Sequence, residues 1–241
     1  MASPLSADQL ANSRSRVGVV PAVVIGASGG IGAALVSALT ELGRPVVGLG
    51  RGSTPPVDLL DEPSIAAAAA TLGASLSLVI DATGFLHSES FIPEKSLREL
   101  DPAHLAYAFA VNATGPAMIM KHFLPLLARN ERAIFATLSA RIGSIADNRL
   151  GGWYSYRASK AALNQLVRTA AIELGRTHKQ AICVALHPGT VHTRLSAPFA
   201  KAGLDVQTPA QSAQRLLSVL DALTVQQSGL LFDHRGKQIP F

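Results

Sequence analysis

Tyr156 and Lys160 stand four residues apart in a stretch whose pattern predicts a helix over residues 154–174. On a helix, residues i and i+4 lie on one face, about 6 Å apart. A tyrosine with an ordinary pKa near 10 needs a shift of about 3 units, or about 4 kcal/mol, to exchange protons near neutrality. One unit charge about 4 Å away supplies about 4 kcal/mol at an effective dielectric of about 20. The pair could therefore transfer protons if both side chains face a cleft, although the same spacing also fits an ordinary amphipathic helix.

A glycine-rich turn follows a short apolar run near the N-terminus. Residues 22–25 are mostly β-branched and predict a buried strand, and residues 33–39 predict a helix. Between them, Gly26, Gly30 and Gly32 allow a tight turn and a close approach of backbone N–H groups to a pyrophosphate. The helix N-terminus then faces the anion. This arrangement predicts a dinucleotide-binding site.

Length and composition predict one α/β unit with a sizeable core. The chain has 241 residues, of which 48% are apolar and 15% charged. We expect a tail over residues 1–18 and one domain over residues 19–241. Residues 1–16 lack the apolar stretch of a secretory signal, and no apolar run is long enough to span a bilayer. We therefore expect a cytoplasmic protein with no membrane partner.

Charge and cysteine usage exclude other classes of function. The net charge is +5, but the basic residues are scattered, so we expect no nucleic-acid partner. The single cysteine, Cys183, lies in an apolar run and reads as a buried strand thiol. Cysteines and histidines do not cluster at metal-ligand spacing, and no metal is expected.

Strand and helix patterns alternate along the rest of the chain. Strands are predicted over residues 45–49, 76–80, 133–138 and 181–186, and helices over residues 65–72, 102–128 and 154–174. This alternation predicts a mostly parallel sheet with helices on both faces. Ligands bind such sheets beyond the carboxyl ends of the strands.

Four motifs in this order resemble the short-chain dehydrogenase/reductase family, and the likeness runs from about Val19 to the C-terminus. The matching residues are the cofactor turn Gly26, Gly30 and Gly32, the helix-interior Asn112, the Tyr156 and Lys160 pair, and the turn Pro188-Gly189 with Val191 and Thr193. The resemblance implies a single-domain Rossmann fold with a doubly wound, mostly parallel sheet of about seven strands. It also implies that Tyr156 transfers the proton, that Lys160 lowers the pKa of this tyrosine, and that Asn112 holds a water in a relay with Lys160.

The resemblance also implies a set of cofactor contacts. Beside the three glycines and the Tyr156 and Lys160 pair, this set comprises Ser28, Ile31, Asp58, Leu59, Ala82, Gly84, Pro188, Val191 and Thr193. Asp58 and Leu59 follow a predicted short strand and match the pair that contacts adenine. Arg51 follows the second strand, where no carboxylate is present, and a guanidinium can pair with a 2′-phosphate. NADP is therefore preferred over NAD.

The family's catalytic serine departs from the pattern. It lies three residues before a glycine, and counting back from Gly143 gives Ala140, which cannot donate a hydrogen bond. A shift of one residue would give the role to Ser139, which we expect to hold the substrate carbonyl; Ser144, or no serine at all, is the alternative. Asp81-Ala82-Thr83-Gly84 replaces the family's Asn-Asn-Ala-Gly and keeps its glycine.

The long segment between Ser139 and Tyr156 is similar to that of the subgroup with C-factor-type signalling proteins and Sniffer-type carbonyl reductases. The resemblance implies an NADP-dependent carbonyl reductase or alcohol dehydrogenase acting on a small-molecule carbonyl or alcohol. The alternative is a signalling or nucleotide-sensing protein that binds the cofactor with little catalysis. Residues 194–208 lie where the family has a variable substrate lid, and a homodimer or homotetramer is expected.

Overall fold

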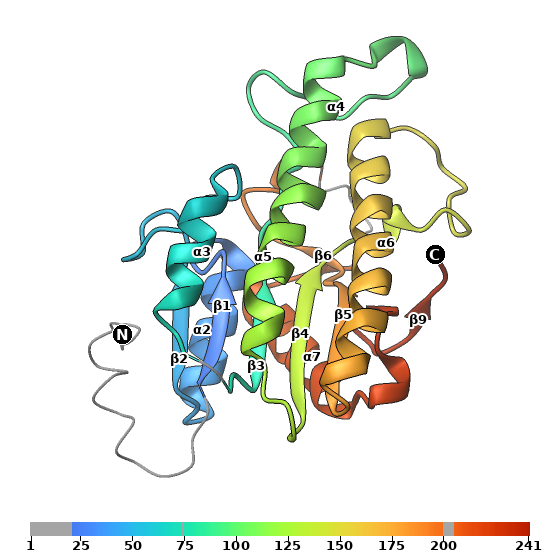
Figure 1. Cartoon of the computed structure of the whole chain (residues 1–241). Coiled ribbons are helices and arrows are strands. Elements are labelled where there is room, and N and C mark those ends of the chain that lie inside the picture. The colour runs from blue at the N-terminus through green and yellow to red at the C-terminus, as the bar shows by residue number, and fades with distance from the viewer. Residues whose placement is uncertain (1–20, 74, 200–204) are drawn as a thin grey trace.

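The computed structural model describes residues 21–73, 75–199 and 205–241 (Figure 1). The expected tail over residues 1–18, and the expected start of the domain at residue 19, lie outside the described residues.

Seven of the strands described in this structure form one sheet in the order β2-β1-β3-β4-β5-β8-β9. Their bounds are β1 Ala22–Ile25, β2 Val46–Leu49, β3 Leu78–Asp81, β4 Ala133–Leu138, β5 Ala181–His187, β8 Leu231–Asp233 and β9 Gln238–Ile239. Every pair of neighbours is parallel except β8 and β9. A separate parallel pair is formed by β6 Thr190–Val191 and β7 Val206–Gln207. The predicted mostly parallel sheet is confirmed.

Helices cover both faces of the sheet. Their bounds are α2 Gly30–Glu41, α3 Glu62–Ala70, α4 Pro102–Phe109, α5 Gly115–Phe123, α6 Tyr154–Thr177 and α7 Pro209–Ala222. One apolar core lies between the sheet and α3, α5 and α6, and the other lies between the sheet and α2 and α7 (Figure 1). The doubly wound fold is confirmed.

The strand order reverses between β1 and β3. From β1 the chain goes outward to β2 and then returns to place β3 on the other side of β1. Such a reversal opens a crevice at the carboxyl ends of the strands. In Figure 1 these ends lie at the top, where α4 rises above the sheet and α6 begins.

Two sequence expectations about local structure are wrong. The helix expected over residues 102–128 is interrupted by a π turn over Ala110–Thr114, since Pro116 has no N–H to donate to the carbonyl four residues earlier. The short third strand expected directly before Asp58 is absent: residues 50–57 form a turn that is closed by a hydrogen bond of 2.9 Å from Val57 N to the Gly50 carbonyl oxygen.

Cys183 lies in β5 with no exposed surface, and burial raises the pKa of its thiol to about 12. The buried strand thiol predicted from the sequence is confirmed. Among the described helices, none is long and apolar enough to cross a membrane.

Candidate active site

The turn after β1 leaves backbone N–H groups free at the start of α2. Gly26 has φ +81°, and a Cβ on Gly32 would lie 2.1 Å from the Gly26 carbonyl oxygen, so both positions require glycine. Gly29 caps α2 without any side-chain hydrogen bond. The first N–H groups of α2 are therefore available to an anion such as a pyrophosphate.

A groove runs from this turn along the carboxyl ends of β1, β2 and β3. Seven of the expected cofactor contacts line it, namely Gly26, Ser28, Arg51, Asp58, Leu59, Ala82 and Gly84. Val57, Thr83, Phe85, Tyr107 and Val111 also line it, and none of them was among the cofactor contacts expected from the sequence. Gly30 lies at the turn itself, where an added Cβ would come within 2.9 Å of Thr193. The structure thus brings the groove-lining residues and Thr193, all of them predicted cofactor contacts, to one edge of the sheet.

Arg51 and Asp58 lie on the outer part of this groove. Arg51 is exposed and, within the described residues, pairs with no carboxylate. Asp58 shapes its own turn, since its Oδ1 accepts a hydrogen bond of 3.0 Å from the Leu60 N–H. The guanidinium is therefore the charge that remains available to a phosphate at the mouth of the groove.

Asn112 joins the π turn to the segment after β3. Its Oδ1 accepts from Phe85 N at 2.8 Å, and its Nδ2 donates to the Phe85 carbonyl oxygen at 2.8 Å and to Ser159 Oγ at 3.2 Å. A Cβ added to Gly84 would lie 3.7 Å from Lys160 Nζ and 3.8 Å from Asn112 Oδ1. Gly84 therefore lies where Asn112 and Lys160 meet.

Tyr156 and Lys160 lie in the first two turns of α6. Lys160 is 2% exposed, its Nζ donates to the Leu138 carbonyl oxygen at 2.7 Å, and this nitrogen lies 5.9 Å from the centre of the Tyr156 ring. Burial lowers the pKa of Lys160 to about 8, while the Asp81 carboxylate acts in the opposite direction. Burial also raises the pKa of Tyr156 to about 12. The expected lowering of the Tyr156 pKa is therefore wrong for the chain by itself, because burial disfavours the phenolate.

Asp81 is a fully buried carboxylate at the end of β3. It accepts hydrogen bonds from Thr83 N at 3.0 Å, Thr83 Oγ1 at 2.6 Å and Thr137 Oγ1 at 2.7 Å. Burial raises its pKa, and these hydrogen bonds together with the charge of Lys160 oppose the rise. The altered motif thus places an acid close enough to Lys160 to affect the charge of the lysine.

The geometry does not support the expected role of Ser139. Its hydroxyl donates to Asn164 Oδ1 at 2.7 Å, and the side chain is 3% exposed. Asn164 lies eight residues after Tyr156 on α6, or about 12 Å along the helix axis. The Ser139 hydroxyl is therefore bonded to a residue about two helical turns beyond Tyr156, and the side chain of Ala140 has no hydrogen-bond donor.

Glu94 is a site residue that the sequence did not reveal. Its buried carboxylate accepts from Ser155 N at 3.2 Å and from Ser155 Oγ, and lies 3.3 Å from His104 Nδ1. Trp153, at the N-cap of α6, has φ +54° and no side-chain cap, and its N–H donates to the Glu94 carbonyl oxygen. Glu94 thus caps the helix that carries Tyr156. It lies 61 residues from Ser155 in sequence, so no local pattern could indicate the contact.

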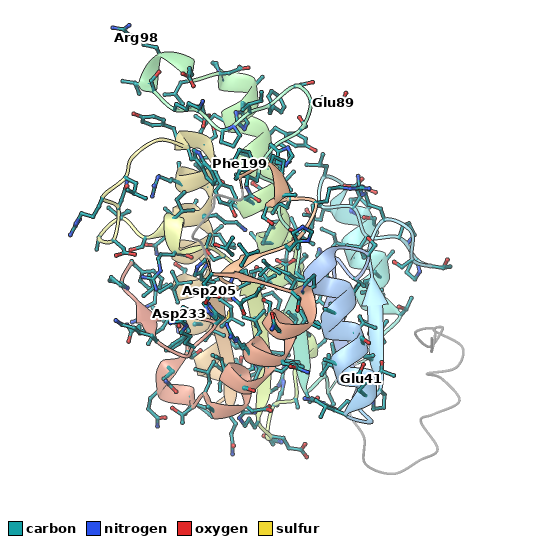
Figure 2. All side chains as sticks on the ribbon, turned by 180° about the vertical axis from the view of Figure 1, so that it is seen from behind. Glu41, Glu89, Arg98, Phe199, Asp205 and Asp233 are labelled. Atoms are coloured by element: carbon teal, nitrogen blue, oxygen red, sulfur yellow. The ribbon has the colours of Figure 1, made fainter. Side chains whose placement is uncertain are left out.

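Aromatic rings form an arc beside Tyr156. The Trp153 ring lies 6.2 Å from that of Tyr156 and 5.0 Å from that of Phe199, and the Phe199 ring lies 5.2 Å from that of His87. Figure 2 shows Phe199 at the same end of the molecule as α4, far from Glu41 at the end of α2. The expected substrate lid therefore contributes at least Phe199 to the site; residues 200–204 of this lid lie outside the described residues.

The Pro188-Gly189 turn follows β5. Gln207 Nε2 and Ser212 Oγ both donate to the Pro188 carbonyl oxygen, at 3.1 and 3.2 Å. Val191 lies in β6 and is 3% exposed, and Thr193 Oγ1 lies 3.1 Å from Ser196 Oγ. Of the expected cofactor contacts Pro188, Val191 and Thr193, Thr193 is the one that lies next to the glycine turn, where an added Cβ on Gly30 would meet it.

Comparisons with known proteins agree with this geometry. The model of the family described as Enoyl-(Acyl carrier protein) reductase matches residues 26–222. The C-signal protein of Myxococcus xanthus is 37% identical over 147 residues, which cover 61% of this chain and 84% of that protein. The 1-hydroxy-2-glutathionyl-2-methyl-3-butene dehydrogenase of Rhodococcus sp. (strain AD45) is 30% identical over 221 residues, which cover 86% of this chain and 93% of that protein.

Solved structures show the same fold. The NADPH-bound carbonyl reductase from chicken fatty liver has a TM-score of 0.79 and 27% identity, covering 93% of this chain and 100% of that chain. The carbonyl reductase Sniffer of D. melanogaster has a TM-score of 0.79 at 22% identity over the same shares, a likeness of fold. This chain belongs to the short-chain dehydrogenase/reductase family. The resemblance to C-factor-type proteins is supported by the C-signal protein, whereas the Sniffer structure shows the shared fold.

Proposed function

We propose that this chain is an NADP-dependent oxidoreductase that transfers hydride between nicotinamide and a carbonyl compound or secondary alcohol. The observation that carries the proposal is the convergence of Asn112, Lys160 and Gly84 at the inner end of the cofactor groove, with Tyr156 one turn away. Hydride transfer requires that an acid group and the nicotinamide both reach the same substrate carbonyl. Residues at this edge of the sheet would hold both.

The free guanidinium of Arg51 supports NADP as the cofactor, with NAD as the weaker choice. Similar structures support it too: besides the chicken enzyme, a Burkholderia multivorans protein solved with bound NADP is 26% identical, with a TM-score of 0.77. When bound, NADPH supplies the hydride. The glycine turn would hold its pyrophosphate, and Arg51 its 2′-phosphate.

The proton comes from Tyr156. Its phenol would donate the proton to the carbonyl oxygen as the carbonyl is reduced to the alcohol. Burial raises the pKa of this phenol, so Tyr156 is protonated at neutral pH and has a proton to give in carbonyl reduction. The ammonium of Lys160, 5.9 Å from the centre of the Tyr156 ring, would stabilise the phenolate that forms. As the family resemblance implies, Asn112 would hold a water that relays the next proton.

The test is a cofactor titration followed by a screen of ketones and aldehydes with NADPH. Tyr156→Phe should lower turnover by about 10²- to 10⁴-fold and leave NADPH affinity unchanged. Binding without turnover across the panel, with Tyr156→Phe indistinguishable from the unaltered protein, would refute the enzyme.

A second candidate is a signalling or nucleotide-sensing protein. Ala140 at the expected serine position and the likeness to the C-signal protein favour it. Against it, a protein that only binds nucleotide has no physical need for Asn112, Tyr156 and Lys160 together. The same screen separates the two functions.

We also propose a homodimer or homotetramer. The outer faces of α5 and α6 form a groove with apolar side chains, which include Ala117, Met120, Leu124, Leu166 and Ala170. Light scattering after gel filtration tests this proposal. The cytoplasmic location and the lack of a nucleic-acid partner stay predictions.

A further inference from the structure

Reduction of a carbonyl places negative charge on its oxygen, and Tyr156 supplies one hydrogen bond to that atom. A second donor is worth about 10²- to 10³-fold in rate when it is aimed at the developing charge. Ala140 offers none, and the Ser139 hydroxyl is committed to Asn164. Ser144 is 2% exposed and its Oγ accepts the Asp147 N–H within its own turn. The end of β4 therefore supplies no clear second donor.

The segment after β3 offers a different group. His87 is three residues beyond Gly84, the residue that lies between Lys160 and Asn112. Phe85, between them in sequence, is fixed by both backbone hydrogen bonds to Asn112. This segment is thus anchored to the catalytic residues just before the histidine.

His87 carries an unused polar atom. Its Nε2 is buried and has no hydrogen-bond partner among the described residues. Buried polar atoms are nearly always paired, so an orphaned one needs an explanation. The His87 ring also lies 5.2 Å from Phe199 and joins the arc that leads through Trp153 to Tyr156.

We propose that His87 Nε2 donates the second hydrogen bond to the substrate's carbonyl oxygen, and that the substrate is an aromatic aldehyde or ketone whose ring packs against Trp153 and Phe199. This proposal rests on the proposed reductase function. A neutral imidazole with its proton on Nε2 is a donor of the required kind. Flat rings pack on aromatic side chains in stacked or edge-to-face contacts, which gives aromatic substrates the advantage over aliphatic ones.

The first test compares variants in NADPH-dependent reduction of acetophenone. His87→Phe keeps a ring against Phe199 but removes the donor, and it should lower kcat about 100-fold, whereas His87→Gln, which can still donate, should lose about tenfold or less. Adding Ala140→Ser to His87→Phe should restore at least about tenfold, because a hydroxyl then occupies the serine position. A kcat for His87→Phe within about threefold of the unaltered protein overturns the proposal, as does an equally large loss for Ser139→Ala.

The second test does not depend on turnover. Trp153 is the only tryptophan of the chain, so quenching of its fluorescence reports on ligands in the arc. Acetophenone titrated into the protein with NADP⁺ should quench it, with an affinity at least about tenfold weaker for His87→Phe and for cyclohexanone. Equal affinities overturn the proposal. Binding that depends on His87, but without reduction of any carbonyl, would refute the reductase while leaving His87 as the residue that binds the carbonyl.

Discussion

Two regions of the active site are built from different parts of the chain: the nucleotide groove at the ends of β1 and β2, and the catalytic edge at the end of β4, where Asn112, Tyr156 and Lys160 lie. The groove uses backbone: the free N–H groups of α2 and glycines that leave no room for a Cβ. The catalytic edge uses side chains from remote segments. Lys160 reaches Leu138, 22 residues away, and Asn112 reaches Phe85, 27 residues away.

This difference predicts how each region responds to substitution. Backbone in a tight turn cannot move aside for an added atom, so the groove should lose binding outright when a glycine is replaced. Side chains in a hydrogen-bond network can be replaced one at a time, so the catalytic edge should lose rate in steps while cofactor affinity persists.

The largest expected effect is that of Gly32→Ala. The added Cβ would lie 2.1 Å from the Gly26 carbonyl oxygen, and NADPH affinity should fall at least about 100-fold, equal to about 3 kcal/mol. Titration with NADPH and a thermal melt measure the effect. Gly52→Ala is the matched control, since its Cβ meets nothing within 4 Å. An affinity of Gly32→Ala equal to that of the control would contradict a groove made of backbone.

Glu94→Ala should act on the catalytic edge alone. It leaves the Ser155 N–H and His104 without their buried partner, which should cost about 1–3 kcal/mol of stability and lower kcat about tenfold. Glu94→Gln keeps one acceptor for Ser155 and should lose less. Unfolding in urea and steady-state kinetics measure the two effects. A drop in NADPH affinity as large as the drop in kcat would show that the two regions are not separable.

Arg51→Ala should change cofactor choice without changing chemistry. Loss of the guanidinium should weaken NADPH binding about tenfold, the worth of a charged hydrogen bond, and leave NADH binding unaltered. Titrations with both nucleotides measure this preference. Equal losses of affinity for NADPH and NADH would show that Arg51 does not bind the 2′-phosphate.

The smallest effect is a shift in pH dependence. Lys160 is protonated below its pKa of about 8, so carbonyl reduction should fall as the pH rises through that value. The Asp81 carboxylate raises this pKa, so Asp81→Asn should move the fall in kcat/KM to lower pH. Rate profiles of both proteins from pH 6 to about 9 span the pKa of Lys160 and show the shift. A fall that moves to higher pH would mean that the carboxylate does not act on Lys160.

The sequence by itself determined the groove and the Tyr156 and Lys160 pair. Glycine requirements, strand and helix periods and the spacing of two residues on one helix are local properties. The glycine turn, the first strand and the helix that carries the pair were found where the sequence predicted them. The interruption by the π turn was missed, although Pro116 was a visible signal for it.

The tertiary structure decided which side chains lie beside Tyr156 and Lys160. Successive residues of a strand point to opposite faces of the sheet. A shift of one residue therefore decides which of Ser139 and Ala140 lies on the face toward α6. In β4, Ala133 and Phe135 belong to the core under α6, and Ser139 continues that face to reach Asn164. The partners of Glu94 and the arc from His87 to Trp153 also join segments far apart in sequence. Burial likewise set the pKa of Tyr156, because the cost of desolvating a phenolate depends on the atoms packed around it, which spacing along a helix does not specify.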